Sequence, residues 1–129
     1  MKYSFFVHGK PKSYNRFSKS NAKNMKKYKD NLVFEARKNV NKIIEKTAII
    51  NIDFFFKIPK RLSVRHPDTW PLYIHNAPDI SLLIHFLIKN MEGILFNNSK
   101  NIVNVNAKKY YCLSPRSEGT KIEIKTINN

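Results

Sequence analysis

Hydrophobic residues recur at every second position in several stretches of the chain, the spacing typical of a β-strand with one buried face. Near the start, Tyr3, Phe5 and Val7 alternate with Ser4, Phe6 and His8. Further along, the four positions Ile50, Ile52, Phe54 and Phe56 alternate with Asn51, Asp53, Phe55 and Lys57. This pattern predicts four strands: Lys2 to His8, Ala48 to Ile58, Ile102 to Tyr111 and Thr120 to Ile127.

Two other stretches have helical spacing. Apolar residues three and four positions apart (Leu32, Ala36, Val40, Ile43) predict a helix from about Ala22 to Lys46, with Asn21 as its N-cap. The run from Pro78 or Asp79 to Met91 is mostly apolar, which predicts a second helix buried on most sides and ended by Gly93.

These elements indicate one α+β domain over residues 1–129, with a mixed or antiparallel sheet of about four strands and two main helices. Lys60 to Pro78 holds three prolines and shows no clear period, so we expect a long loop that leads to Asp79. Leu113 to Gly119 joins the last two strands.

The net charge of the chain indicates the kind of partner that it binds. Against 24 Lys and Arg stand nine Asp and Glu, a formal charge of +15, which favours a polyanionic partner. A Lys- and Asn-rich composition, typical of an AT-rich bacterium or phage, is the plainer explanation, but that bias raises Glu as well as Lys. No run is long enough to span a membrane, the start is not typical of a signal peptide, and Cys112 is the single cysteine. We therefore expect a cytoplasmic, bacterial or phage-encoded protein, with Cys112 buried rather than reactive.

Basic residues gather in three places, and lysine and arginine there neutralise phosphates. The candidate DNA-binding residues are Lys10, Lys12, Arg16, Lys19, Lys23, Lys26 and Lys27, then Lys60 and Arg61, then Lys108, Lys109 and Arg116. Tyr14 and Phe17 are placed to stack on exposed bases, although a solvated loop explains the same segment. No base-reading motif occurs, so recognition of DNA shape and backbone is expected.

The order of short motifs between residues 75 and 103 is more informative than the composition. Residues 75–83 read His-Asn-Ala-Pro-Asp-Ile-Ser-Leu-Leu, an apolar helix leads to Gly93, and residues 96–103 read Phe-Asn-Asn-Ser-Lys-Asn-Ile-Val. This resembles the metal-binding core of RusA-type Holliday-junction resolvases, in which Pro-Asp-hydrophobic-Asp-Asn opens a helix and an Asp-Asp pair follows the helix-ending Gly. Weaker likenesses lie at residues 5–11, 54–60 and 108–124, the last resembling a closing hairpin.

The resemblance implies a homodimeric α+β nuclease that binds four-way DNA junctions and cleaves them symmetrically with Mg²⁺. It assigns Asp79 as the first carboxylate and metal ligand, Ser81 as the place of the second, and His85 as the place of an assisting Lys. Asn98 and Ser99 take the place of the later Asp pair, and Leu82 that of the motif Asn.

Most of the family's carboxylates are therefore replaced by neutral side chains. Mg²⁺ prefers oxygen ligands including one or two protein carboxylates, and two-metal hydrolysis needs more charge still. Glu92 lies roughly 16 Å along the helix from Ser81, too far to share a metal with Asp79. Asp53 and Asp68 lie outside the motif, although the strand that carries Asp53 leaves a rebuilt site open.

Each of these residues has a plainer interpretation. Asp79 is also a normal acid for a helix N-terminus, and Asn97 to Ser99 is ordinary turn sequence. His75, Asp79 and His85 form a conceivable transition-metal cluster, but their spacing fits no tight metal motif.

The leading hypothesis is a RusA-like protein of DNA recombination and repair that binds Holliday junctions and whose Mg²⁺-dependent cleavage is weak or lost. Whether it is an enzyme stays open. One alternative is an active, Mg²⁺-dependent junction resolvase with a rearranged site. Another is a basic RNA- or protein-binding module with an incidental likeness.

Overall fold

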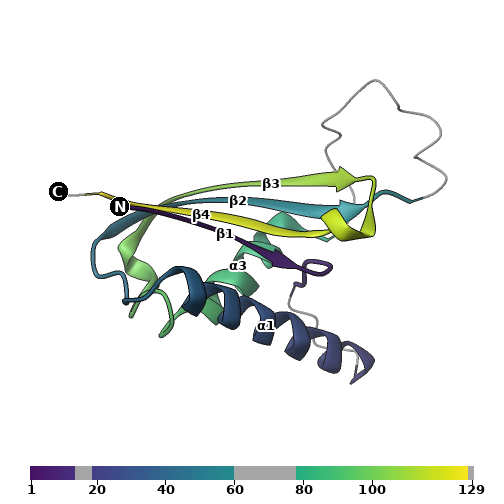
Figure 1. The fold of residues 1–129 in the computed structure, drawn as a ribbon, viewed down its shortest axis with the longest axis horizontal. Helices are drawn as coiled ribbons and strands as arrows, with labels where there is room; N and C mark the ends of the chain where they lie inside the picture. Colours follow the sequence, from purple (N-terminus) through teal and green to yellow (C-terminus); the bar gives the residue numbers. More distant parts are fainter. Residues whose placement is uncertain (14–18, 60–77, 128–129) are drawn as a thin grey trace.

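The computed structural model describes residues 1–13, 19–59 and 78–127, and of residues 19–24 the backbone alone. Along the chain it has β1 (Lys2–His8), α1 (Lys19–Asn39), β2 (Thr47–Lys57), α3 (Ile80–Met91), β3 (Ile102–Cys112) and β4 (Gly119–Ile127), shown in Figure 1. All four predicted strands and both predicted helices are present. The prediction of an α+β fold with a four-stranded sheet is confirmed.

The four strands form one mixed sheet in the order β1-β4-β2-β3. β4 is antiparallel to both of its neighbours, whereas β2 and β3 are parallel. The expected closing hairpin is therefore wrong, because β4 lies between β1 and β2 and does not pair with β3. Two parallel strands require a crossover connection, which α3 provides, and this leaves the last strand to fill the gap beside β1.

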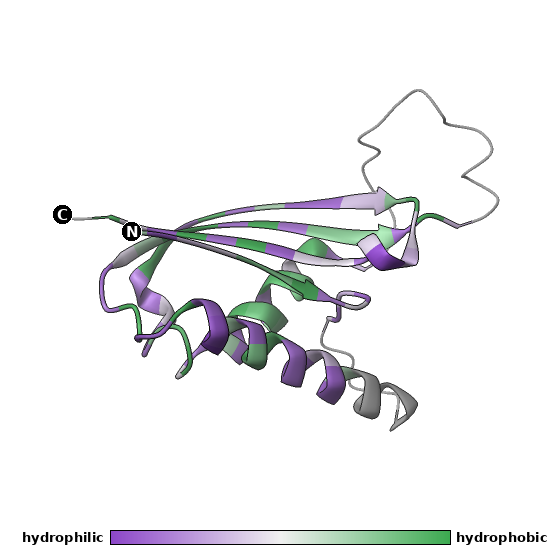
Figure 2. Ribbon diagram, in the orientation of Figure 1, coloured by the Kyte–Doolittle hydropathy of each residue, from purple (hydrophilic) through white to green (hydrophobic). Residues whose placement is uncertain are grey.

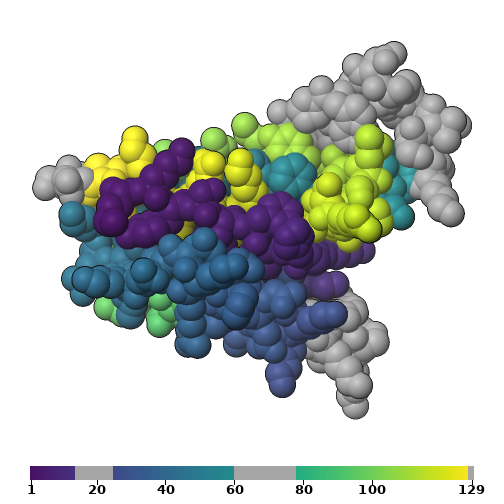
Figure 3. Space-filling view, viewed as in Figure 1, coloured from purple at the N-terminus to yellow at the C-terminus, as the bar shows by residue number. Residues whose placement is uncertain are grey.

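Both helices lie on one face of the sheet, and the core fills the space between them (Figure 1). The strand alternation is confirmed: the inward set is buried and comprises Phe5, Val7, Ile50, Ile52, Phe54, Phe56, Ile122 and Ile124. Figure 2 shows a largely hydrophobic α3 and a largely hydrophilic outer side of α1. In Figure 3, β1 lies directly against α1 at the surface. No helix in the described residues is long and apolar enough to span a membrane.

The first helix is displaced from its predicted range. It begins at Lys19, so Asn21 lies inside it rather than at the N-cap, and it ends at Asn39 rather than Lys46. Beyond that end the backbone N–H of Ile44 donates to the carbonyl of Leu95 at 2.6 Å, and Ile44 forms a bridge with Phe96. This tertiary pairing draws residues 40–46 out of the helix. It buries Ile44 and leaves Ile43 41% exposed.

The second helix has its predicted range, with Asp79 as the N-cap and Met91 as the last residue, but it is less enclosed than predicted. Its buried residues are Leu83, Phe86, Leu87 and Met91, whereas Leu82 is 44% exposed, so one side faces outward. Gly93 ends the helix as predicted. It has a positive φ of 82°, and its N–H donates to the carbonyl of Phe96 at 2.7 Å.

Candidate nucleic-acid interface

The direction of the strands brings distant basic residues to one edge of the sheet. Because β4 is antiparallel to both β1 and β2, and β3 is parallel to β2, the strands β1, β2 and β3 all end at the same edge. Lys10 and Lys12 follow β1, and Pro78 precedes the helix that returns from that edge. These three residues line one hollow of about 180 Å³, together with Pro11, Ser13, Met25 and Phe56.

Asp79 is the N-cap of α3, and one of its carboxylate oxygens accepts both hydrogen bonds of the cap. Its Oδ1 accepts hydrogen bonds from the backbone N–H and the hydroxyl of Ser81, both at 2.8 Å. These two bonds, led by the hydroxyl, hold the pKa of Asp79 below its ordinary value, with a further contribution from Lys109. The carboxylate is exposed and charged at neutral pH.

Lys109 closes the same corner from the sheet. It pairs in register with Phe54, so its side chain lies on the helix side of β3, and its Nζ donates to the carbonyl of Pro78 at 2.7 Å. This bond fixes the backbone just before the helix. It also leaves an ammonium group beside the Asp79 carboxylate.

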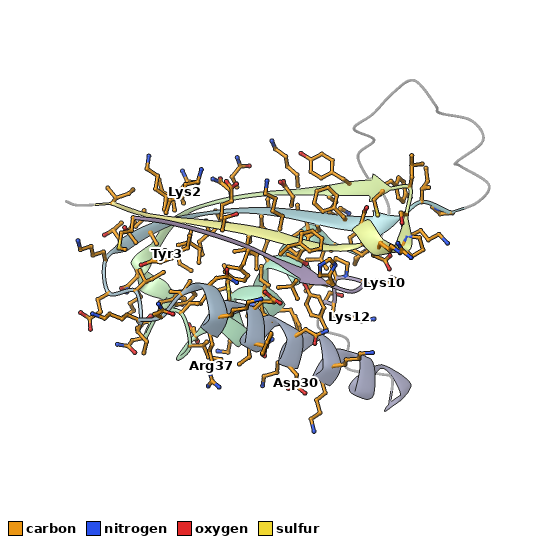
Figure 4. All side chains as sticks on the ribbon, in the orientation of Figure 1. Lys2, Tyr3, Lys10, Lys12, Asp30 and Arg37 are labelled. Carbon is orange, nitrogen blue, oxygen red and sulfur yellow. The ribbon has the colours of Figure 1, made fainter. Side chains whose placement is uncertain are left out.

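A second hollow continues the basic surface away from Pro78. It has a volume of about 290 Å³, and three lysines line it, Lys10, Lys12 and Lys27, with His8, Gly9, Tyr28 and Asn31. Figure 4 shows Lys10 and Lys12 close to each other beyond the end of β1. Partial burial, and after it the charge of Lys10, lowers the pKa of Lys12. An anion bound there would offset the repulsion between the two lysines.

Tyr28 holds α1 in position under this surface. Its hydroxyl is hydrogen-bonded to the hydroxyl of Thr120 on β4, and both residues are buried. Its ring lies 6.1 Å from that of Phe86 on α3, centroid to centroid. Burial raises the pKa of Tyr28 to about 12. The basic hollow is thus attached to the core and not to a free loop.

The structure places the other motif residues at the far end of α3. Twelve helical residues span about 18 Å, and Glu92 is the C-cap. There the Glu92 side chain accepts a hydrogen bond from the backbone N–H of Ser99 at 3.2 Å, and Asn98 caps the short 3₁₀ helix Ser99–Asn101. Ser81 is therefore brought to Asp79, whereas Asn98 and Ser99 are not. His85 is exposed partway along the helix. It interacts electrostatically with Glu92 and, after the hydrogen bonds from Ser99, contributes to the lowered pKa of that residue.

These positions decide how well the donors fit a metal. In the described ranges there is no group of three or more His, Cys, Asp or Glu side chains close enough to hold a metal ion. Among the described residues, the donors added near Asp79 are the neutral hydroxyl of Ser81 and the carbonyl of Pro78, and the latter already binds Lys109. This donor set does not fit Mg²⁺, because one carboxylate with a shared oxygen competes poorly with water.

The third predicted basic patch is divided by the sheet. Lys109 faces the helices, but Lys108 points to the opposite face, and Arg116 lines a hollow on that face. Asp53 lies there as well, so the strand does not bring it to Asp79. Lys26 is exposed on α1. Lys19 and Lys23 are described by backbone alone, and Arg16, Lys60, Arg61, Asp68 and His75 lie outside the described residues, as do Tyr14 and Phe17.

The sequence prediction missed the hollow that contains Asp53 and Arg116. It is about 970 Å³ and lies on the sheet face away from the helices, where Phe6, Phe55 and Tyr110 gather. The signal was present in the three consecutive residues Phe54, Phe55 and Phe56. A strand that buries its first and third residues presents the second on the other face.

Comparison with protein families gives a match over most of the chain. The family model described as Endodeoxyribonuclease RusA matches residues 8–125, which include every element except most of β1 and the last residues of β4. Comparison with curated proteins finds no match.

Proposed function

The chain belongs to the endodeoxyribonuclease RusA family, and from that premise we propose that it is a homodimeric binder of branched DNA whose Mg²⁺-dependent cleavage is weak or absent. The family consists of nucleases related to Holliday-junction resolvases, so the likeness seen in the sequence is not incidental. What is specific to this chain is the balance of charges around Asp79.

The observation that carries the proposal is the convergence of Lys10, Lys12 and Lys109 beside Asp79 at one edge of the sheet. Lys27 extends the group along α1. Ammonium groups held by a rigid scaffold neutralise phosphates of the DNA backbone and release counterions on binding. The edge therefore supports DNA binding without the carboxylates that hydrolysis requires.

Weak cleavage is supported by the separation along α3. Asp79 has a serine hydroxyl as its near neighbour, and the next carboxylate along the motif, Glu92, lies at the other end of the helix. Metal-assisted phosphodiester hydrolysis depends on ligands that neutralise the cation and fix its position. A homodimer suits a substrate with two-fold symmetry, since each copy then meets an equivalent strand.

Binding is tested by gel shift with a four-way junction and a linear duplex of equal length. We expect tighter binding to the junction, and Lys12→Gln should lower the slope of log affinity against log salt by about one. The matched control is Lys42→Gln, which removes the same charge from an exposed residue near the start of β2, at the opposite edge. Equal affinity for both DNAs, or equal effects of both variants, contradicts the proposal.

Cleavage is tested by incubating a labelled junction with Mg²⁺ or Mn²⁺. We expect little or no product, and any product should disappear in Asp79→Asn but persist in Asp30→Asn, an exposed acid on α1. Efficient symmetrical cutting that depends on Asp79 would show an active resolvase with a rearranged site. Sedimentation velocity with and without the junction measures the oligomeric state, and a monomer in both conditions contradicts the homodimer.

A further inference from the structure

The face of the sheet opposite the helices has an aromatic strip of its own. Phe6, Phe55 and Tyr110 come from β1, β2 and β3, and we call these three residues the aromatic strip. The rings of Phe55 and Tyr110 are stacked, with centroids 5.4 Å apart and an interplanar angle of 18°. The ring centroid of Phe6 lies 6.4 Å from that of Phe55. The ring of His8 packs edge-on against Phe6, with centroids 4.7 Å apart.

Gly119 allows the strip to cross the whole sheet. In the register it lies between His8 of β1 and Phe55 of β2. A Cβ at this position would lie 2.5 Å from Cε1 and 2.6 Å from Cζ of Phe6, so the ring occupies the space a side chain of β4 would fill. The rings from β1, β2 and β3 thus form one continuous surface in spite of the intervening strand.

Basic residues outnumber acidic ones on this face of the sheet. Six basic residues lie on this face or line its hollow: Lys2, Lys57, Lys108, Arg116, Lys121 and Lys125. The acids are Asp53 and Glu123, with Glu118 in the turn before β4. Asp53 lies in register between Lys108 and Lys121, and Lys121 forms an ion pair with Glu123 at 3.6 Å. Arg116 and Lys121 line the hollow of about 970 Å³ with Asp53, so the balance of charge is positive both in the hollow and on the face as a whole.

We propose that the aromatic strip is a second nucleic-acid site, which binds unpaired bases of single-stranded DNA or RNA by stacking. Flat rings on a basic surface are an arrangement that binds single strands without sequence preference, since every base has a π-face and every linkage a phosphate. This proposal depends on the proposed function in one respect, that the partner of the protein is a nucleic acid. The aromatic strip lies on the opposite face of the sheet from Asp79 and Lys109.

A second copy of the chain is the rival occupant of such a face. Two identical faces brought together would each carry six basic residues against three acids, and juxtaposed faces of like net charge oppose association. A phosphate backbone has the complementary charge. The charges therefore favour the nucleic acid.

The test measures binding of a single-stranded oligothymidylate of about 10 nucleotides by fluorescence anisotropy. Phe55→Leu and Tyr110→Leu keep an apolar side chain but remove the ring, and each should weaken binding by roughly fivefold or more. Phe34→Ala is the control, because Phe34 is 64% exposed on α1 and lies outside the strip. Thermal unfolding monitored by circular dichroism verifies that each variant is folded.

Two further readouts separate this site from the edge near Asp79. Lys12→Gln should weaken junction binding and leave oligothymidylate binding nearly unchanged, whereas the two ring variants should do the reverse. Loss of oligothymidylate binding in the ring variants supports the strip even if junctions are not preferred. Unchanged oligothymidylate binding in both ring variants overturns the proposed site. If the ring variants also change from dimer to monomer while their oligothymidylate affinity stays the same, the face is a dimer interface instead.

Discussion

The two faces of the sheet are built from the same strands but have opposite characters. On β2, the buried residues Phe54 and Phe56 face the helices, and Phe55 between them lies half-buried on the open face. The helix face gains stability from burial, and its functional groups are confined to the edge where Asp79 and the lysines meet. The open face keeps its rings near the solvent. One strand therefore supplies both the core packing and the proposed recognition surface, and adjacent residues are the natural probes of the difference.

The largest effect should come from replacing the adjacent phenylalanines of β2. Phe54 is 1% exposed, so Phe54→Ala leaves a core cavity and should cost about 3–5 kcal/mol of unfolding free energy. Phe55→Ala removes a ring that is only partly buried and should cost about 1–2 kcal/mol. Urea denaturation measures both. Similar losses for the two variants would mean that the open face is covered in solution.

An intermediate effect should appear at alkaline pH through Tyr28. Its pKa is raised from 10.0 to about 12 in the folded protein, so the unfolded chain loses this proton first. The associated stability is fully present below pH 10 and is lost as the pH rises toward 12, by roughly 2–3 kcal/mol. Tyr28→Phe should lack this part of the alkaline loss. Unfolding free energies of both proteins at pH 9 and 11 decide it, and parallel losses would refute the assignment.

The smallest effect concerns Asp79. Ser81→Ala removes the hydroxyl that makes the first contribution to the low pKa of Asp79, so this pKa should rise toward its ordinary value. A low folded-state pKa stabilises the protein above the ordinary value, and this stability is lost as the pH falls through the folded pKa. NMR titration of the Asp79 carboxyl carbon reads the shift directly. An unchanged titration would show that the backbone N–H of Ser81 suffices.

Much of the fold was predictable from the sequence because alternation and helical spacing report burial directly. The buried positions of β2 and the end of α3 at Gly93 were obtained in this way. Strand order was not, because the alternation of β4 is equally satisfied beside β3 or between β1 and β2. The end of α1 was missed for a related reason. The hydrogen bond from Ile44 to Leu95 joins residues that are distant in sequence.

The candidate site was predicted in its residue types more than in its geometry. Lys10, Lys12, Lys109 and Asp79 were named from charge and resemblance, and the structure brings them together. Lys108 and Lys109 were assigned to one patch, yet neighbouring residues on a strand point to opposite faces. The aromatic strip was missed because it depends on rings from three strands that meet only when Gly119 lies between them.

The shared direction of β1, β2 and β3 also has a consequence for protein engineering. Their carboxyl-terminal ends converge at one rim, where Ser13 and Ser81 surround the start of α3 without being part of the core. Acids introduced at these two serines would collect near Asp79 and leave every buried side chain intact. The two rim positions are thus separate from the buried residues of the core, so the donors near Asp79 can be changed without altering the core packing.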